Sequence, residues 1–142
     1  LAVQTPEKGW SASFDWQQRY QYYRLSIFGP LGANRMLLSG NSRHAVLESA
    51  GRIEEAIDAE MLLKKRLGWY LPVNSLHYWV QGSPAPGAPH QILRNAAGEI
   101  IEINQQGWDI QYQEYNDSGL PTLIELYYGK LRIRIAIREW ML

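Results

Sequence analysis

The pattern that decides the fold is the strict alternation of residues 131–138, LRIRIAIR. The leucine and the isoleucines share one face of an extended chain, and the three arginines lie on the other face. A period of two over this length is typical of a strand with one buried and one solvated face. The stretch therefore predicts an antiparallel sheet that covers a core on one side.

The same period recurs through both ends of the chain. Residues 10–17, WSASFDWQ, alternate apolar and polar side chains, and a second strand follows over residues 20–28. Further strands are expected around 36–38, 45–47, 101–103, 108–112 and 123–128, separated by short turns. An antiparallel meander is the simplest interpretation of this order.

The middle of the chain changes to a helical period. The spacing predicts a helix over 58–67, with Asp58 as its N-cap, and a shorter helix that begins at Asn74 or Ser75 and ends at Gly82. Glu54 and Glu55 are expected in a polar connection, and residues 82–89 in a loop rich in proline and glycine. We expect one mainly β (α+β) domain over residues 1–142, in which helices cover one face of a curved sheet.

Composition excludes several classes of function. The 142 residues carry 14 Lys and Arg against 14 Asp and Glu, without a basic cluster for nucleic acid, and no apolar run is long enough for a membrane-spanning helix. Cysteine is absent, which removes disulfides, thiolate nucleophiles and cysteine-ligated zinc. Size and neutral charge favour a monomer. Because the chain begins at Leu1 without a Met or a signal sequence, we expect it to be a fragment of a longer precursor.

The sequence offers little for catalysis. His44, His77 and His90 are scattered without the spacing of metal ligands, so no metal site is expected. No nucleophile elbow, Walker lysine or dinucleotide-binding glycine motif occurs, so no cofactor is expected. The carboxylate pairs Glu54-Glu55 and Asp58-Glu60 are explained by solvation and by the start of a helix.

Two features of the sequence allow a function beyond core packing. The chain holds 6 Trp, 9 Tyr and 2 Phe, and such rings either pack the core or line a cavity with a wet rim. In Gly29-Pro30-Leu31-Gly32, the proline and the second glycine fit a type I turn, which places Leu31 at its tip. An exposed leucine there is either an ordinary surface residue or a contact with a membrane or an apolar partner.

Several motifs together resemble the LolB family, the outer-membrane lipoprotein receptors of Gram-negative bacteria. They are Phe28-Gly29-Pro30-Leu31-Gly32, LGWYLPV at 67–73 with Leu76, WVQG at 79–82, QGW at 106–108, Leu120-Pro121 and the segment from Arg132 to Trp140. The resemblance spans residues 10–140. The signal peptide, the lipidated cysteine and the tether of that family are absent from this chain.

The resemblance implies a LolA/LolB-like unclosed, curved antiparallel β-barrel with short helices as a lid over an apolar cavity. It also implies that the protein accepts triacylated lipoproteins from the periplasmic carrier LolA and inserts them into the inner leaflet of the outer membrane, among its phospholipids. The location implied is the periplasmic face of the outer membrane, with a lipid anchor on an N-terminal cysteine absent here. In that family, the leucine of the Pro-Leu-Gly loop protrudes and serves membrane delivery, and Leu31 holds its position.

Candidates for the cavity lining are inward residues of the strands and helices. Alternation shows which residues share a face, but core packing and a ligand cavity use the same face. The candidates are Phe14, Trp16, Leu25, Ile27, Met36, Leu38, Leu63, Trp79, Trp108, Ile110, Leu126 and Ile133.

Two alternative functions stay open. One is a soluble periplasmic carrier of lipoprotein acyl chains or free fatty acids, similar to LolA or to a lipocalin, which would not need an exposed Leu31. The other is a small hydrolase that uses His77 or His90 with a carboxylate, for which no motif exists.

Overall fold

The computed structural model of the chain describes residues 10–28, 35–41, 43–67 and 70–141. In this part the chain forms ten strands of one sheet and two short helices. In chain order they are β1 (Trp10–Arg19), β2 (Tyr22–Phe28), β3 (Met36–Gly40), β4 (Ala45–Ser49), β5 (Arg52–Ala56), α1 (Ala59–Leu67), α2 (Val73–Trp79), β6 (His90–Arg94), β7 (Ile100–Gln105), β8 (Trp108–Tyr115), β9 (Pro121–Tyr128) and β10 (Leu131–Met141).

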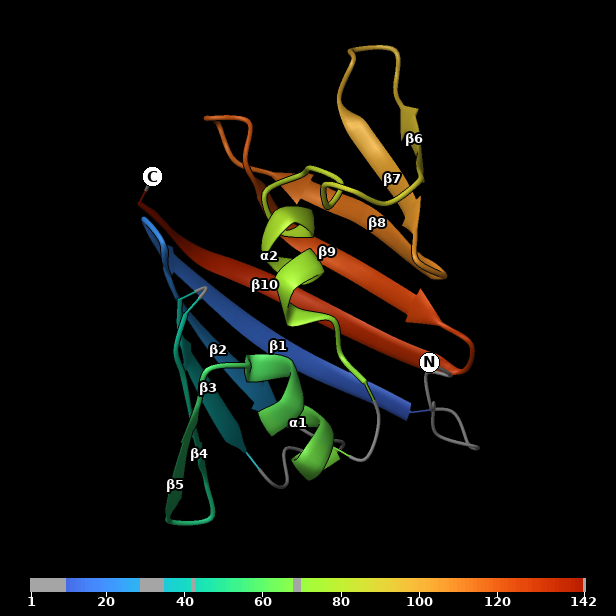
Figure 1. The fold of residues 1–142 in the computed structure, drawn as a ribbon. Helices are drawn as coiled ribbons and strands as arrows, with labels where there is room; N and C mark the ends of the chain where they lie inside the picture. Colours follow the sequence, from blue (N-terminus) through green and yellow to red (C-terminus); the bar gives the residue numbers. More distant parts are fainter. Residues whose placement is uncertain (1–9, 29–34, 42, 68–69, 142) are drawn as a thin grey trace.

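The sheet consists of two five-stranded meanders that meet at its centre (Figure 1). The strand order is β5-β4-β3-β2-β1-β10-β9-β8-β7-β6, so the first and last strands of the chain are neighbours. They pair in parallel, whereas all the other neighbouring pairs of the sheet as described are antiparallel. Parallel pairing needs a long crossover, and here the crossover contains both helices and the other eight strands.

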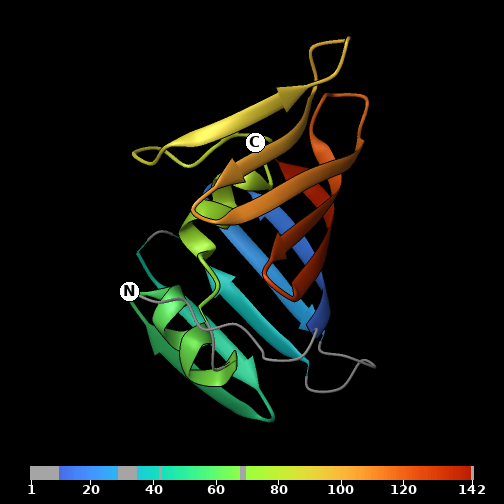
Figure 2. The ribbon, with the colours of Figure 1, turned by 90° about the vertical axis from the view of Figure 1, so that its right-hand side faces the viewer.

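The sheet curves around the helices and stays unclosed (Figure 2). Its two outer strands, β5 and β6, are the ends of the strand order and do not pair with each other. Both helices lie on the concave face, with α1 against β4 and β5. Neither helix in the described part of the chain is long and apolar enough to cross a membrane. The predicted mainly β, unclosed barrel with short helices on one face is therefore confirmed.

Apolar side chains form rows across the strands on the concave face of the sheet. Each row consists of residues that are paired between neighbouring strands, because paired residues point to the same side of the sheet. One row crosses five strands through Ala12, Ile133, Leu126, Ile110 and Ile103, and all five are buried.

The turn between β7 and β8 explains why the motif QGW is needed. Gln106 and Gly107 both have positive φ angles, 55° and 83°, as a tight two-residue hairpin turn requires. A Cβ atom on Gly107 would lie 2.9 Å from Cε2 of Tyr128. Glycine therefore serves both the backbone conformation and the close approach of a ring.

Local sequence signals identified some elements and missed others. Asp58 caps α1 as predicted, because its Oδ1 accepts the backbone N–H of Glu60 at 2.9 Å. The polar connection predicted at Glu54 and Glu55 is wrong, since both residues belong to strand β5. The loop predicted over residues 82–89 is followed directly by β6, which begins at His90 and was not among the predicted strands.

Candidate functional site

The interior of the curved sheet holds all twelve side chains predicted to line an apolar cavity. All twelve are buried and belong to one hydrophobic cluster. Of these, Phe14, Trp108 and Met36 keep 1%, 2% and 8% of their surface exposed, and the other nine keep none. Those nine are Trp16, Leu25, Ile27, Leu38, Leu63, Trp79, Ile110, Leu126 and Ile133.

Complete burial has a consequence for any apolar ligand. A side chain without exposed surface touches no void that could hold even a water molecule. A ligand can therefore reach these nine side chains only if neighbouring side chains or the covering helix move. The structure brings the predicted set together, and its role as a ligand-binding lining stays a prediction.

Several aromatic rings of the interior pack against one another. The ring centroids of Trp79 and Trp108 lie 6.2 Å apart, and Tyr128 lies 5.0 Å from Trp108. On the other side, Trp16 stacks on Tyr23 at 5.2 Å with an interplanar angle of 20°. These tilted and stacked pairs follow the geometries that aromatic rings prefer, and together they account for much of the large aromatic surface.

The helix α2 is fixed to the sheet through one buried carboxamide. The Gln105 side chain, at the end of β7, is only 3% exposed. Its Oε1 accepts the indole N–H of Trp79 and the backbone N–H of Ala85, both at 2.8 Å. Its Nε2 donates to the carbonyl oxygens of Ala85 at 2.8 Å and Ala88 at 3.2 Å. Every bond that this amide can make is therefore used to hold the helix and the segment that follows it.

A second polar contact supports the same attachment from β8. The Tyr112 hydroxyl donates to the carbonyl oxygen of Trp79 at 2.6 Å. Burial raises the pKa of Tyr112, so its hydroxyl stays a donor at all physiological pH values. The C-terminal end of α2 is thereby attached to two strands through one tryptophan.

The two helices are joined by the carboxylate of Glu60. Its Oε1 accepts the hydroxyl of Tyr70 at 2.5 Å, and its Oε2 accepts the backbone N–H of Asn74 at 3.0 Å. Burial and this hydrogen bond raise the pKa of Tyr70. Glu60 lies in α1 and Asn74 lies in α2, so one side chain connects the two helices.

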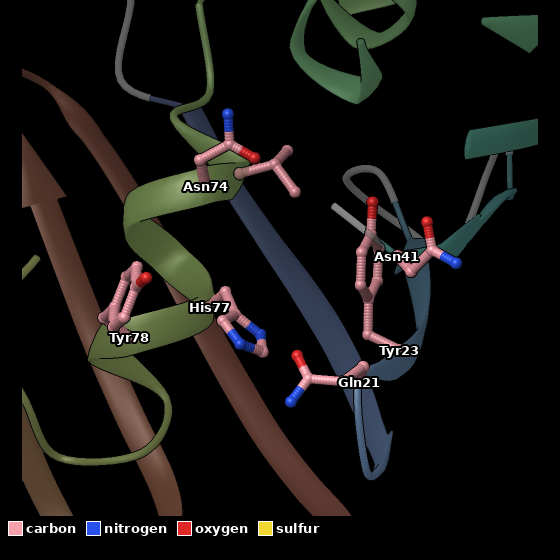
Figure 3. Close-up of a pocket in the computed structure, with 7 residues that line it drawn as sticks. Gln21, Tyr23, Asn41, Asn74, His77 and Tyr78 are labelled. Atoms are coloured by element: carbon pink, nitrogen blue, oxygen red, sulfur yellow. The ribbon is translucent and has the colours of Figure 1, made fainter. Parts of the chain in front are cut away.

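A pocket of about 250 Å³ opens between α2 and the ends of β2 and β3 (Figure 3). Its floor is made by Tyr23 and Val73, which are buried members of the hydrophobic cluster. Its rim is polar and is formed by Gln21, Asn41, Asn74, His77 and Tyr78. Burial lowers the pKa of His77, so its imidazole is neutral at pH 7.

Among the three histidines, His44 lies near a carboxylate, since its Nε2 is 3.6 Å from Oε2 of Glu55 and both side chains are exposed. The seven residues that line the pocket of His77 include no carboxylate. His90 is exposed, and its Nδ1 lies 3.4 Å from the carbonyl oxygen of Ala88. No group of three or more His, Cys, Asp or Glu that could hold a metal ion occurs in this part of the chain.

The predicted membrane-insertion loop, Gly29, Pro30, Leu31 and Gly32, lies outside the described residues. Its nearest described neighbours are Phe28, at the end of β2, and Arg35, before β3. The Arg35 guanidinium carbon lies 5.4 Å from the centroid of the Phe28 ring, within the range of a cation–π contact.

Sequence reasoning missed the polar residues that attach the helices. Gln105 lies two positions after Ile103, so alternation places it on the inward face, and a polar residue at an inward position is the available signal. Its partners lie 17 to 26 residues away along the chain, and a local pattern does not reveal them.

Comparisons with known proteins agree on one family. The family model described as "Outer membrane lipoprotein LolB" matches residues 1–140. Curated proteins named "Outer-membrane lipoprotein LolB" are similar along the whole chain. The protein from Cellvibrio japonicus is 37% identical over 151 residues, covering 100% of this chain and 74% of that protein. The one from Chromohalobacter salexigens is 36% identical over 145 residues, covering 100% and 68%. The one from Pseudomonas fluorescens is 34% identical over 146 residues, covering 99% and 71%.

Proposed function

The chain belongs to the LolB family of outer-membrane lipoproteins, and we propose that it accepts acylated lipoproteins from a LolA-like periplasmic carrier and inserts them into the inner leaflet of the outer membrane. Family membership supports the general role in the localisation of outer-membrane lipoproteins. The handover and the insertion are the proposed steps. The observation that carries the proposal is the cluster of large apolar side chains enclosed between an unclosed sheet and two small helices.

Handover in this proposal is driven by differences in binding rather than by nucleotide hydrolysis. Each methylene that leaves water contributes about 0.8 kcal/mol, so a chain of about fifteen methylenes gains about 12 kcal/mol in an apolar site. The same free energy would be lost if the acyl chain entered water, so the lipid does not diffuse freely. The acyl chains therefore pass from one apolar site to the next, each holding them more tightly than the one before.

Opening of the interior is the protein's own part in this step. Because nine of the twelve interior side chains have no exposed surface, binding has to be coupled to displacement of α2 or of the aromatic rings. The helices are short, of nine and seven residues, and they cover the concave face, so they are the elements that we expect to move.

The proposal includes a location and a role for Leu31. The domain works at the periplasmic face of the outer membrane, held by a lipid anchor on a cysteine outside this chain. Leu31 enters the acyl region of the bilayer and lets the cargo leave. A soluble carrier of acyl chains or free fatty acids is the second candidate, because its interior would look the same and only membrane delivery would differ.

The test is a two-stage transfer assay without detergent or ATP. A LolA-like carrier loaded with triacylated lipoprotein is mixed with this domain, and the cargo is followed first by co-purification and then into liposomes. Leu31→Glu is expected to accept cargo normally and to insert it at least tenfold more slowly, because a charge resists entry into the acyl region. Leu93→Glu is the matched control, since Leu93 is a leucine 54% exposed on the edge strand β6.

Each outcome decides one step. Failure of the wild-type domain to take cargo from an active carrier would refute the receptor function. Acceptance without delivery to liposomes would favour the soluble carrier. Equal insertion by Leu31→Glu and the wild-type domain would refute the role of that leucine.

A further inference from the structure

We propose that the pocket between α2 and the ends of β2 and β3 binds the neutral polar junction of a lipoprotein, the ester and amide groups that join its acyl chains to its polypeptide. This inference rests on the proposed function and adds a second, polar subsite to the apolar interior. Its ligand class is uncharged carbonyl and amide groups. The residues that carry it are Gln21, Asn41 and Asn74, with Tyr23 beneath them.

The position of the pocket is the first argument. Its floor residues Tyr23 and Val73 are 5% and 1% exposed and belong to the same hydrophobic cluster as the interior. Tyr23 also stacks on Trp16, one of the predicted lining residues. If the acyl chains of a lipoprotein lay in the interior, its polar junction would therefore lie beside the polar rim of this pocket.

The chemistry of the rim is the second argument. Gln21 lies across the gap from the neutral imidazole of His77, Asn41 lies beyond Tyr23 on the side of Gln21, and Asn74 lies on α2 with His77 (Figure 3). The Oδ1 of Asn41 already accepts the backbone N–H groups of Arg43 and His44, at 2.8 and 3.1 Å, so its amide nitrogen is left to donate. Amide N–H groups are suitable donors for the carbonyl oxygens of esters and amides.

Charge and size restrict the ligand further. The seven residues that line the pocket include no Lys or Arg, so nothing among them compensates the charge of a phosphate headgroup. Burial, and after it the charges of Glu60 and Asp58, raise the pKa of Tyr23 to about 12, and these negative charges near the pocket oppose an anion. A volume of about 250 Å³ lies below the roughly 300–1,000 Å³ of ordinary ligand pockets, which suits a small polar junction rather than several long acyl chains.

The experiment compares a lipoprotein with a ligand that lacks the junction. The double variant Gln21→Leu/Asn74→Leu keeps the size of the rim and removes two amides. Its affinity for triacylated lipoprotein, delivered by the carrier, is expected to fall about thirtyfold, as for two lost hydrogen bonds of ordinary strength. Its affinity for a fluorescent free fatty acid, which has no such junction, is expected to stay unchanged. Gln113→Leu, an exposed amide of β8, is the matched control.

A second measurement does not depend on the fold of the double variant. The chain has no cysteine, so Gln21→Cys provides a unique thiol for a short photo-crosslinker. Crosslinking to the acylated N-terminal residue of the cargo is expected, and crosslinking only to distant parts of the cargo would overturn the inference. Equal lipoprotein affinity of the double variant and the control would also overturn it. If the wild-type domain binds the fatty acid and takes no lipoprotein, the proposed function fails, and the inference fails with it.

Discussion

Removal of the Gln105 carboxamide is expected to loosen α2 by an amount that the structure allows us to estimate. In Gln105→Ala, the indole N–H of Trp79 and the backbone N–H of Ala85 lose their acceptor, and two carbonyl oxygens lose a donor. An unpaired buried donor costs about 1–3 kcal/mol, and of the two carbonyl oxygens only that of the half-buried Ala88 can readily recover water. Two such donors give an expected loss of about 3 kcal/mol in the free energy of unfolding.

The assay is urea unfolding followed by tryptophan fluorescence. With a slope of about 1.5–2 kcal/mol per molar urea, a loss of 3 kcal/mol lowers the midpoint by about 1.5–2 M. Gln113→Ala removes an exposed amide of the neighbouring strand β8 and is expected to change stability by less than about 0.5 kcal/mol. A midpoint for Gln105→Ala equal to that of Gln113→Ala would refute the role of this hydrogen-bond network.

A double-mutant cycle separates the network from simple loss of packing. Trp79→Phe keeps an aromatic ring in the interior and removes the indole N–H that Gln105 accepts. If the hydrogen bond matters, the two substitutions together cost about 1 kcal/mol less than the sum of their separate effects. If the two effects on the free energy of unfolding were strictly additive, Gln105 would stabilise α2 by packing alone and not through this hydrogen bond.

Two further predictions concern a turn between strands and a buried carboxylate of β9. Gly107→Ala is expected to lose about 1–3 kcal/mol more than Gly98→Ala in urea unfolding: both glycines have a φ near +85°, but only at Gly107 would the new Cβ meet Tyr128. Glu125 accepts a hydrogen bond from the Tyr127 hydroxyl at 2.6 Å, which together with its arginine neighbours holds the pKa of this carboxyl below its ordinary value. Its stabilising effect is therefore full above the ordinary carboxyl pKa and disappears as the pH falls through the lower, folded value. Glu125→Gln should lose less stability than the wild-type domain between pH 7 and pH 3, and an equal loss would contradict this assignment.

Predictions from the sequence were most accurate for features that depend on residues close together in the chain. Alternation identified the inward faces of β1 and β10, because the period of two is a local property of an extended chain. The start of α1 was identified from Asp58 for the same reason, since a cap bonds within its own helix. The buried set at the candidate site follows from these local signals.

Prediction failed where the decisive partner is distant or where the pattern is weak. β5 carries Glu54 and Glu55, and as an edge strand it is mostly exposed, so its alternation is hidden. β6 is the edge strand at the other end of the sheet, and it is also mostly exposed, so its alternation is hidden too. The parallel pairing of β1 with β10 depends on where the chain returns after more than a hundred residues, and no local pattern contains that information.

In the proposed function, the polar contacts of the helices contribute to the cost of opening the interior. Apolar packing contributes as well, because Val73, Leu76 and Trp79 of α2 are buried. A few hydrogen bonds through Gln105, Tyr112 and Glu60 fix the position of the helices and can be exchanged for water when they move. In the proposed function, acyl chains would replace the contacts that the helices leave, at about 0.8 kcal/mol for each methylene. The apolar interior would then supply affinity, while the polar attachments would help to keep that interior closed until a cargo is offered.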